Sequence, residues 1–337
     1  MKKSIKLVLL AFGLVTTFLS VFIYHVLFSS NLEDMQNDIT ISCRKQKSIE
    51  EFIALNQLPV SRSFDFKLAC AIKRFSKIKP GNYRFTAGMS NTEIIHHLRS
   101  GGIPVVSVRL DSATDIYGIA GVLGASMRYD STEFITQFLD PLLLDSLQTD
   151  SFNVSGLILP NTYEFYWNMS PKAFIQRMMK EQTSFWTADR KLKAQALDLS
   201  EKEIVILASI VKAETATLEE ANMIAGLYLN RLRIGMPLQS DPTAIFGTRK
   251  NAQRVYLSDI QSDNPYNTYK FKGLPPGPIN LPEAAYIEAV LKASTHRYIY
   301  MCAQPGGTGR HNFALSLSEH ESNRRSYIRW LNSRSIE

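Results

Sequence analysis

The sequence predicts an α+β protein that one N-terminal helix anchors in a membrane. Three observations support this prediction: an uncharged apolar run at residues 7–28, alternating short strand and helix patterns over 39–104, and helical patterns mixed with short strands and stiff loops over 105–337. A chain of 337 residues is long enough for two or three domains with a substantial core. We expect a cytoplasmic tip and transmembrane anchor at 1–30, a polar tether at 31–38, a small α+β module at 39–104 and a larger mixed α+β domain at 105–337.

Composition and charge indicate a globular protein that does not bind nucleic acid. With 45% hydrophobic and 20% charged residues, the composition is that of a globular protein. The net charge is +7, and three of the lysines, Lys2, Lys3 and Lys6, precede the apolar run. The remaining positive excess is small and dispersed, so we expect no nucleic-acid partner. It would suit an anionic polymer or a membrane surface only weakly.

The run from Leu7 to Phe28 contains no charged residue. Its length of about 20 residues matches the hydrocarbon core of a bilayer. The three lysines before it favour an N-terminus in the cytoplasm. A cleaved signal peptide is the alternative, but the run is longer than a typical signal-peptide core and no small-x-small cleavage site follows it. We therefore predict a single-pass anchor with the rest of the chain outside the cytoplasm.

The cysteines Cys43, Cys70 and Cys302 are an odd number without the spacing of a metal site. A Cys43–Cys70 disulfide is one alternative in an oxidising compartment. Buried free thiols are the favoured interpretation, because a chain of this length does not need disulfides for stability. The sequence also lacks an H-E-x-x-H motif, a Walker or dinucleotide glycine pattern and a G-x-S-x-G elbow. We predict no metal and no cofactor.

The small module is predicted from a series of short elements. In order, these are a strand at 39–42, helices at 48–55 and 64–75, a turn and strand at 79–85, and a helix that a capping box of Ser90 and Glu93 opens, ending near Arg99 with Gly101 and Gly102 as its stop. Such a module is too small to account for the whole function.

The larger domain is predicted to be mainly helical at first and rich in loops later. Its elements are a strand at 105–110, helices at 116–123 and 131–139, a loop and strand at 156–165, a long helical region at 171–197, the helix that contains residues 204–215, a second helix from the capping box of Thr217 and Glu220 to Gly235, and loops over 236–311.

The helix at Ile204–Thr215 carries the strongest chemical signal. Ser200 and Glu203 have the form of a capping box that opens it. Glu214 falls in the middle of an apolar face formed by Ile204, Leu207, Ile210 and Val211. A carboxylate in apolar surroundings usually responds with a raised pKa, which makes Glu214 a candidate general acid. The alternative is that Glu214 sits at the helix end and turns to water.

Three later segments suit a groove for a sugar polymer. They are residues 239–247, 265–269 and 273–279, in which Pro, Gly and Asn dominate. Tyrosine rings cover sugar faces, while Asn, Gln and Asp bond hydroxyl and amide groups. The alternative is a set of ordinary rigid turns. His311 and His320 show no specific spacing to a serine, and we expect them to be mainly structural.

Four motifs in order resemble the MltG (YceG-like) family of endolytic murein transglycosylases: Ala208–Thr215, Leu229–Thr243, Tyr266–Tyr269 and Gly273–Ile279. The resemblance extends over most of the chain. It implies a LysM-like glycan-binding module at 39–104 and a YceG-like catalytic domain at 105–337. This sequence departs from the family pattern where Lys212, Ser155 and Asn161 stand in place of acidic residues, and the strand near 108–112 lacks the family's usual Pro-Glu-Gly turn.

The resemblance also implies roles for individual residues. The family's catalytic glutamate matches Glu214. Substrate contacts are expected from Gln239, Asp241, Tyr266, Asn267 and Tyr269. If Asp241 faced Glu214 across the scissile bond, a hydrolytic muramidase would be the expected enzyme instead.

The implied function is cleavage of the bond between N-acetylmuramic acid and N-acetylglucosamine within nascent peptidoglycan strands, without water. This leaves 1,6-anhydro ends and terminates strand elongation. The expected location is the bacterial inner membrane, with a cytoplasmic N-terminus and a periplasmic or extracytoplasmic catalytic domain. Peptidoglycan glycan strands are the expected substrate, and peptidoglycan synthases are expected partners by resemblance. A non-catalytic peptidoglycan-binding scaffold is the alternative of another class.

Overall fold

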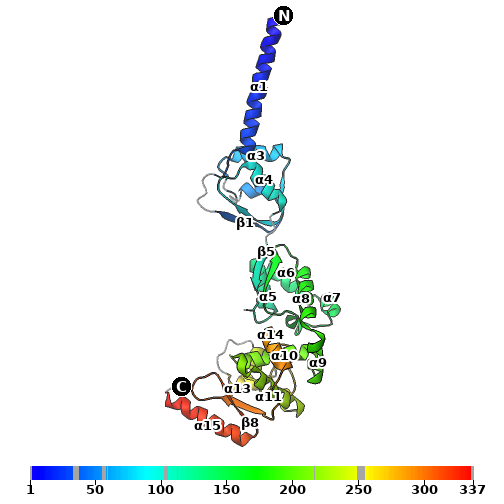
Figure 1. Ribbon diagram of the computed structural model, residues 1–337, viewed down its shortest axis with the longest axis vertical. Coiled ribbons are helices and arrows are strands. Elements are labelled where there is room, and N and C mark those ends of the chain that lie inside the picture. The colour runs from blue at the N-terminus through cyan, green and yellow to red at the C-terminus, as the bar shows by residue number, and fades with distance from the viewer. Residues whose placement is uncertain are drawn as a thin grey trace. The chain divides into compact units, whose positions relative to one another are not determined.

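Figure 1 shows the computed structural model, in which helices predominate over short strands. It describes residues 2–32, 38–54, 58, 60–101, 105–111, 113–215, 217–248 and 255–334. The chain forms two compact units. The smaller unit comprises Met1–Val106, Ser126–Tyr129 and Glu164–Met169, and the larger unit comprises Ser107–Ala125, Asp130–Tyr163 and Ser170–Glu337. The predicted α+β class is confirmed.

The apolar N-terminal run forms one long helix, α1 (Lys2–Phe28). Its segment Leu10–Phe28 is long and apolar enough to cross a membrane. Large side chains along this segment are exposed, Phe18 by 75%. The helix predicted from the sequence is therefore present, and its exposed apolar surface is compatible with a membrane anchor.

The module after α1 combines two short antiparallel ladders with three helices. β1 (Ile39–Cys43) pairs with β4 (Gly81–Phe85), Ile39 opposite Phe85, and β2 (Lys47–Ser48) pairs with β3 (Lys77–Ile78). The helices are α2 (Ile49–Ala54), α3 (Ser63–Ile72) and α4 (Asn91–Ser100). The predicted capping box of Ser90 and Glu93 is formed, and Gly101 ends α4 in the left-handed conformation, with φ of +85°. Gly102 lies outside the described residues.

The polar tether expected at 31–38 is wrong at its start. Asn31 and Leu32 are fully buried in the module, and residues 33–37 lie outside the described residues. The Asn31 side-chain amide donates to Asn91 Oδ1 at 2.7 Å, and the Asn91 amide donates to the carbonyl oxygen of Val26 at 2.8 Å. Val26 and Leu27 are buried in the module's core. The end of α1 is thus part of the module.

The cysteines of the structure are free thiols. Cys43 and Cys70 are buried in the module, and Cys302 is half-buried in the larger unit. Burial raises the pKa of the Cys70 thiol to about 12, which keeps it protonated and unreactive at neutral pH. The favoured interpretation, buried free thiols, is confirmed for Cys43 and Cys70.

Helices dominate the larger unit as well. The elements that follow α4 along the chain are β5 (Val105–Arg109), α5 (Ile116–Ser126), α6 (Ser131–Phe138), α7 (Pro141–Ser146), a 3-10 turn η1 (Val154–Leu157), β6 (Thr162–Tyr166), α8 (Pro171–Phe185) and α9 (Ala188–Ala196). β5 and β6 form one two-stranded sheet. The long helical region predicted at 171–197 consists of two helices, because Thr187 adopts an extended conformation and caps α9.

The later elements are α10 (Glu201–Glu214), a 3-10 turn η2 (Leu218–Glu220), α11 (Ala221–Arg233), α12 (Asp241–Thr248), α13 (Leu257–Ile260), α14 (Ala284–Leu291), β7 (Tyr300–Ala303), β8 (His311–Ala314) and α15 (Leu317–Ser333). The capping box expected at Thr217 is wrong, because the Thr217 side chain caps nothing and η2 precedes α11. The range 236–311 was expected to be rich in loops, and its described residues also form three short helices and strand β7, which pairs with β8 in an antiparallel hairpin.

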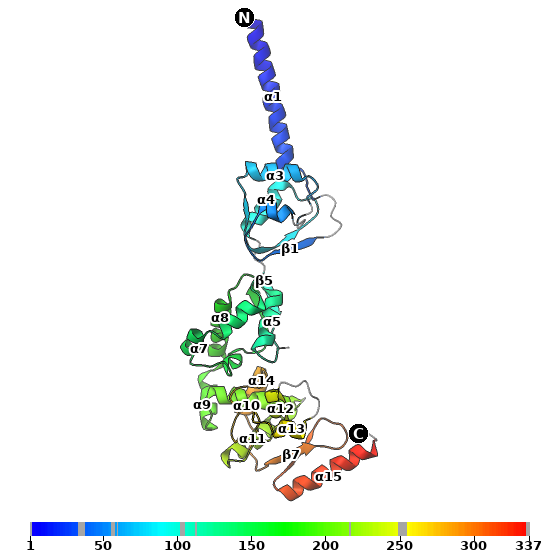
Figure 2. The ribbon, with the colours of Figure 1, turned by 180° about the vertical axis from the view of Figure 1, so that it is seen from behind.

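The core of the larger unit is organised around α10. Every residue from Ile204 to Val211 is buried, as expected for a helix that is apolar nearly all round. Helices α11, α12 and α14 pack against it, and Figure 2 shows α10 among them. Glu214 is the last residue of α10.

Candidate active site

Local sequence positions Glu214 at the end of α10. The capping box of Ser200 and Glu203 begins the helix, as predicted. The helix ends because Thr215 is extended, and the Thr215 hydroxyl accepts a hydrogen bond from the Thr217 backbone N–H at 3.1 Å. This turn directs the chain away from the helix axis and leaves the Glu214 side chain facing a cavity.

The cavity has a volume of about 270 Å³. Four residues proposed from the sequence lie around it together: Glu214, Gln239, Asp241 and Tyr269. The other lining residues are Leu227, Tyr228, Arg231, Leu238, Met301, Cys302, Ala303 and His311. The cavity beside Glu214 is thus lined by elements that are distant in the sequence: α10, α11, the start of α12 and the β7–β8 hairpin.

One oxygen of the Glu214 carboxyl group is held by two hydroxyl donors. Tyr228 Oη donates to Glu214 Oε1 at 2.7 Å, and Ser240 Oγ donates to the same oxygen at 2.5 Å. Among the described residues, none donates a hydrogen bond to the second oxygen, Oε2. Because Oε1 accepts two hydrogen bonds, the proton of the neutral acid is placed on Oε2. The alternative that Glu214 turns to water at the helix end does not describe this geometry.

The surroundings raise the pKa of the Glu214 carboxyl group above its ordinary value. The largest cause is burial, which disfavours the charged form. The hydrogen bonds from Ser240 and Tyr228 act in the opposite direction, and the charge of Asp241 adds to the increase. The residue as a whole is half-buried, but its carboxyl group is enclosed by protein atoms. The protonated form of Glu214 is therefore favoured more than that of an exposed glutamate.

A buried hydroxyl network fixes Ser240. The Ser240 backbone N–H donates to Thr268 Oγ1 at 3.0 Å, and Thr243 Oγ1 donates to the Ser240 carbonyl oxygen at 2.7 Å. The hydroxyls of Thr243 and Thr268 lie 2.8 Å apart, and all three residues are at most 2% exposed. Fully satisfied polar networks of this kind hold one geometry. The segments at 239–247 and 265–269 are therefore joined beneath Glu214.

The proline-rich loop at 273–279 is fastened to α10. Ser209 Oγ accepts a hydrogen bond from the Ile279 backbone N–H at 3.0 Å, and the Asn280 amide donates to the Ser209 carbonyl oxygen at 2.8 Å. Lys212 donates to the Leu281 carbonyl oxygen at 2.8 Å and forms an ion pair with Glu283 at 2.5 Å. Lys212, where the family resemblance leads one to expect an acid, thus holds the start of α14 against α10.

Asp241 and Tyr269 form a second polar pair in the cavity. Tyr269 Oη donates to Asp241 Oδ1 at 2.5 Å. Burial and this acceptor raise the pKa of Tyr269, so its hydroxyl group stays protonated. The Asp241 side chain is exposed at the first residue of α12. Both groups are accessible to a ligand of the cavity.

Tyr266 and Asn267 occupy different surroundings from those expected. The Asn267 side chain is fully buried, and its amide donates to backbone carbonyl oxygens, at 2.8 Å to that of Ser262. This geometry assigns Asn267 to the folding of its loop and not to a ligand. Tyr266 is 8% exposed and packs on Phe246, with ring centroids 4.8 Å apart. It borders a separate cavity of about 880 Å³ that Ala213 and Ser155 also line.

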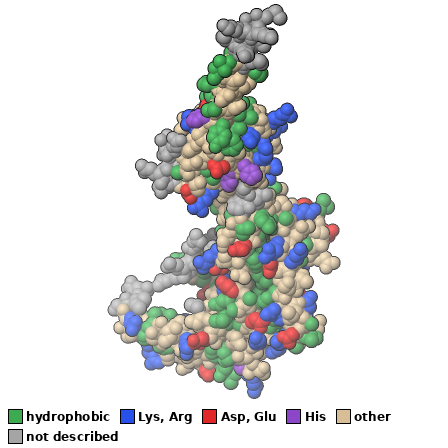
Figure 3. Space-filling model, turned by 45° about the horizontal axis from the view of Figure 1, so that its top comes forward, with side chains coloured by type: hydrophobic (Ala, Val, Ile, Leu, Met, Phe, Trp, Pro, Cys, Tyr) green, Lys and Arg blue, Asp and Glu red, His purple; other side chains and the backbone are tan. Residues whose placement is uncertain are grey.

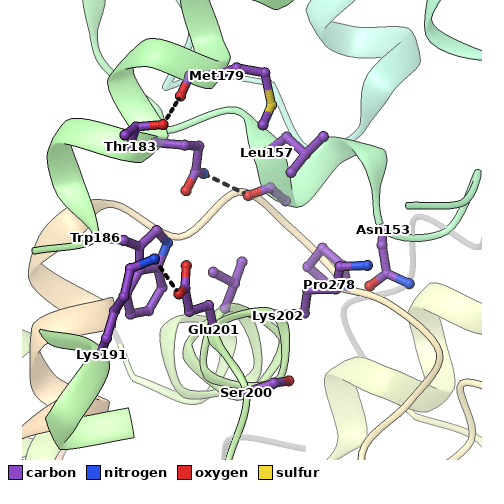
Figure 4. A pocket seen from close by; sticks show the side chains of 13 residues that line it. Asn153, Leu157, Met179, Thr183, Trp186, Lys191, Ser200, Glu201, Lys202 and Pro278 are labelled. Atoms are coloured by element: carbon purple, nitrogen blue, oxygen red, sulfur yellow. Dashed lines mark hydrogen bonds and ion pairs between the residues drawn. The ribbon is translucent and has the colours of Figure 1, made fainter. Parts of the chain in front are cut away.

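Another cavity, of about 460 Å³, lies at the N-terminal end of α10 (Figure 4). Its walls include Leu157, Met179 and Trp186, and Lys191 pairs with Glu201 at 2.9 Å beside the tryptophan. It is mainly apolar, and its glutamate is neutralised by the lysine. Glu214 is at the opposite end of the helix, and the candidate active site is the cavity beside it.

Sequence reasoning missed several residues of the site. Tyr228, Ser240 and Arg231 were not proposed, and His311 was expected to be structural. The signal available for Tyr228 and Arg231 was polar groups within the buried helix α11. The Arg231 guanidinium donates to the carbonyl oxygens of Ile299 and Leu238, at 2.7 and 2.6 Å, and so supports the cavity wall. His311 Nδ1 lies 3.0 Å from Glu220 Oε2.

Gln239 has a strained backbone conformation, with φ of +52°. Such conformations cost on the order of 1–3 kcal/mol in a residue with a side chain and cluster at functional sites. We expect Gln239→Gly to raise the free energy of unfolding by roughly 1 kcal/mol, because glycine adopts this φ without strain. Denaturant unfolding measures the change. Gln261→Gly is the control, since φ there is −93° and glycine should destabilise. Equal losses in both variants would contradict the strain at Gln239.

Three comparisons place this geometry among known proteins. A family model described as the YceG-like family matches residues 46–326. An endolytic murein transglycosylase of Bacillus subtilis (strain 168) is 28% identical over 278 residues, which are 78% of this chain and 77% of that protein. One of Streptococcus pneumoniae (strain R6) is 27% identical over 298 residues, 78% of this chain and 53% of that protein.

A solved structure is similar in fold. The crystal structure of a yceG-like protein from Listeria monocytogenes matches with a TM-score of 0.60 and 23% sequence identity. The match covers 86% of this chain and 99% of the Listeria chain.

Proposed function

The chain belongs to the YceG-like family, and from this premise we propose that it is a membrane-anchored endolytic murein transglycosylase. Its proposed substrate is the glycan strand of peptidoglycan, cleaved internally between N-acetylmuramic acid and N-acetylglucosamine. The observation that carries the proposal is the Glu214 carboxyl group, with two donors on Oε1 and its pKa raised by burial. The similar transglycosylases support the substrate class.

In the first step, protonated Glu214 acts as the general acid. The proton passes from Oε2 to the glycosidic oxygen, and the bond between this oxygen and C1 of the muramic acid breaks. The leaving sugar departs with a free hydroxyl group. The positive charge that develops at C1 is met by the substrate's own acetamido group, a route used by glycosidases that have one acid instead of two.

In the second step, Glu214 acts as the base. Its carboxylate takes the proton from the C6 hydroxyl group, and the C6 oxygen forms a bond with C1 to give the 1,6-anhydro end. No water is consumed, and Glu214 is protonated again. Tyr228 and Ser240 hold Oε1 throughout, which keeps Oε2 as the oxygen that exchanges the proton. Gln239, Asp241 and Tyr269 are proposed to contact the sugars.

The remaining parts of the chain are proposed to bring this site to its substrate. Residues 1–30 anchor it in the bacterial inner membrane with a cytoplasmic N-terminus. Residues 39–104, as a LysM-like module, bind glycan, and residues 105–337 carry out catalysis outside the cytoplasm. Cleavage at this position would end the elongation of nascent strands, with peptidoglycan synthases as partners.

One observation favours a second candidate, a hydrolytic muramidase. Asp241 lies in the same cavity as Glu214, and its charge raises the pKa of Glu214. A second carboxylate placed across the scissile bond would activate water. The bond from Tyr269 to Asp241 Oδ1 argues for a binding role, because it occupies one of the oxygens that a base would need.

The products distinguish these functions. We expect the full-length chain in detergent micelles to release peptidoglycan fragments that end in 1,6-anhydro sugars, one water lighter than hydrolytic products, as measured by mass spectrometry. Asp241→Asn should retain the anhydro products. Reducing ends that disappear in Asp241→Asn would establish the muramidase instead, and binding without cleavage would identify a scaffold.

The two donors to Glu214 offer a test of the proton's position. In Ser240→Ala or Tyr228→Phe we expect the pKa of Glu214 to rise further, since each hydroxyl stabilises the carboxylate. A hydrogen bond to a charged group is worth about 1.5–3 kcal/mol, or roughly 1–2 pKa units. The alkaline limb of the pH–rate profile should move upward by that amount. Tyr256→Phe, at a 60% exposed tyrosine, is the control and should leave the profile unchanged.

A further inference from the structure

Helix α3 has two apolar faces. One face, with Phe66, Ala69 and Cys70, is buried in the core of the small module. On the opposite face, the exposed apolar residues Phe64, Ala71 and Ile72 recur at helical spacings of seven and eight, and Leu68 beside them is half-buried against the module's core. Phe64 is 72% exposed and Ile72 is 41% exposed. Phe64 and Ile72, with Ala71 between them, form an apolar strip on the solvent side of α3, and exposed apolar surface of this kind marks contacts with proteins or membranes when it is contiguous.

The start of α3 is fastened to the end of α1. The Arg62 backbone N–H donates to Asn31 Oδ1 at 2.6 Å, and the Arg62 guanidinium donates to the Ser30 carbonyl oxygen at 2.6 Å. α1 and α3 pack against each other, and both ribbon views show α3 at the lower end of α1 (Figures 1 and 2). In the space-filling view, hydrophobic side chains along α1 recur on the adjoining part of the module (Figure 3).

The length of α1 fixes how far α3 is from the hydrocarbon layer. From Leu7 to Tyr24 the helix rises about 27 Å, close to the roughly 30 Å of a bilayer's hydrocarbon core. The next turn contains the aromatic residue Phe28, whose ring lies 5.1 Å from that of Tyr24. Tyrosine is enriched at membrane interfaces. If α1 spans a bilayer up to Tyr24, the headgroup layer begins at this turn, and α3 packs on the same end of α1.

We propose that the outer face of α3 (Phe64, Ala71 and Ile72) inserts into the headgroup region of the membrane that α1 spans. Lys67, exposed beside this face, and Lys73 and Arg74 at the end of α3 are suited to lipid phosphates. Asp65 is paired with Arg62 at 3.0 Å and adds no free negative charge. The proposal rests on the membrane anchoring in the proposed function, and it assigns a second membrane contact that holds the module against the surface.

Tryptophan quenching by lipid tests the proposal. Phe64→Trp is introduced into the full-length chain, which is reconstituted in vesicles whose lipids carry bromine near the headgroup end of the acyl chains. Thr40→Trp is the matched control, because Thr40 is an exposed residue of the same module on β1, away from α1 in Figures 1 and 2. Tyr24→Trp reports the anchor itself. The signal of the three native tryptophans is subtracted with the parent chain.

We expect Phe64→Trp and Tyr24→Trp to lose most of their added emission, and Thr40→Trp to keep it. Quenching of Tyr24→Trp alone would overturn the contact of α3 with lipid and leave the anchor intact. Quenching at none of the three positions would overturn both. Equal quenching at positions 64 and 40 would also overturn the proposal, since the contact would then not be specific to α3.

Discussion

Replacing Glu214 with Gln is expected to lower the rate of glycan cleavage by about 10²–10⁴-fold, the contribution typical of one general acid. Glutamine has nearly the same shape, and its carbonyl oxygen can accept the hydrogen bonds of Tyr228 and Ser240 that Oε1 accepts in the parent. It cannot supply a proton to the glycosidic oxygen. The release of anhydro fragments, measured by mass spectrometry, should fall while binding of peptidoglycan is retained.

The same substitution should change stability in a pH-dependent way. The pKa of Glu214 is raised in the folded protein, so between its unfolded and folded pKa values the folded state binds more protons. The free energy of unfolding of the parent then falls as pH rises through this window. Glutamine does not ionise. Glu214→Gln should therefore match the parent below about pH 4, the ordinary range of a glutamate pKa, and exceed it at neutral and alkaline pH.

Unfolding curves at pH 4 and pH 8 measure this difference. Glu164→Gln serves as the control, because this exposed glutamate has no such surroundings and its replacement should alter neither stability nor cleavage. An inactive Glu214→Gln variant that is no more stable than the parent at pH 8 would contradict an enclosed acid. An active variant would remove Glu214 from the mechanism.

The sequence predicted the parts of the site that depend on local pattern. The capping boxes of Ser90 and Ser200 place helix starts within a few residues, and the apolar residues around Glu214 predict its enclosure. Tyr228 and Ser240 depend on tertiary packing, because they lie 14 and 26 residues from Glu214 in the chain. No periodic pattern joins them to the acid.

Loop conformation explains why Tyr269 lines the cavity of Glu214 while Tyr266 and Asn267 do not. In the segment at 265–269, Asn264 and Asn267 each accept a hydrogen bond from the backbone N–H two residues later. These turns direct Tyr269 to the cavity of Glu214 and enclose Asn267. Composition shows that tyrosine and asparagine are present, but not which of them the turns direct inward.

The tether was predicted wrongly for a related reason. Asn31 is polar and follows an apolar run, so it was assigned to a linker, but its amide donates hydrogen bonds to buried groups of α4 and of the segment before α3.

The end of α1 also belongs to the core of the small module. Removing residues 1–29 should unfold the small module, because Val26 and Leu27 are 1% and 8% exposed within its core.

Each of these side chains contributes about 1.5–3 kcal/mol by burial, so the loss is about 3–6 kcal/mol. The hydrogen bonds that Asn91 and Thr92 donate to the carbonyl oxygens of Val26 and Leu27 are lost as well. A module of this size is stable by roughly 3–10 kcal/mol at about 0.05–0.15 kcal/mol per residue. The truncation therefore removes most of its stability.

The matched comparison is between a chain that begins at residue 22 and one that begins at residue 30. Both lack most of the anchor, but only the first keeps Val26 and Leu27 in the core. We expect hydrogen exchange to show protected amides at Phe52 and Ile94 in the longer chain and loss of that protection in the shorter one. The core of the larger unit around α10 should be unchanged in both. Equal protection in the two chains would mean that α1 only adjoins the module, and a soluble fragment could then be cut after α1 without loss.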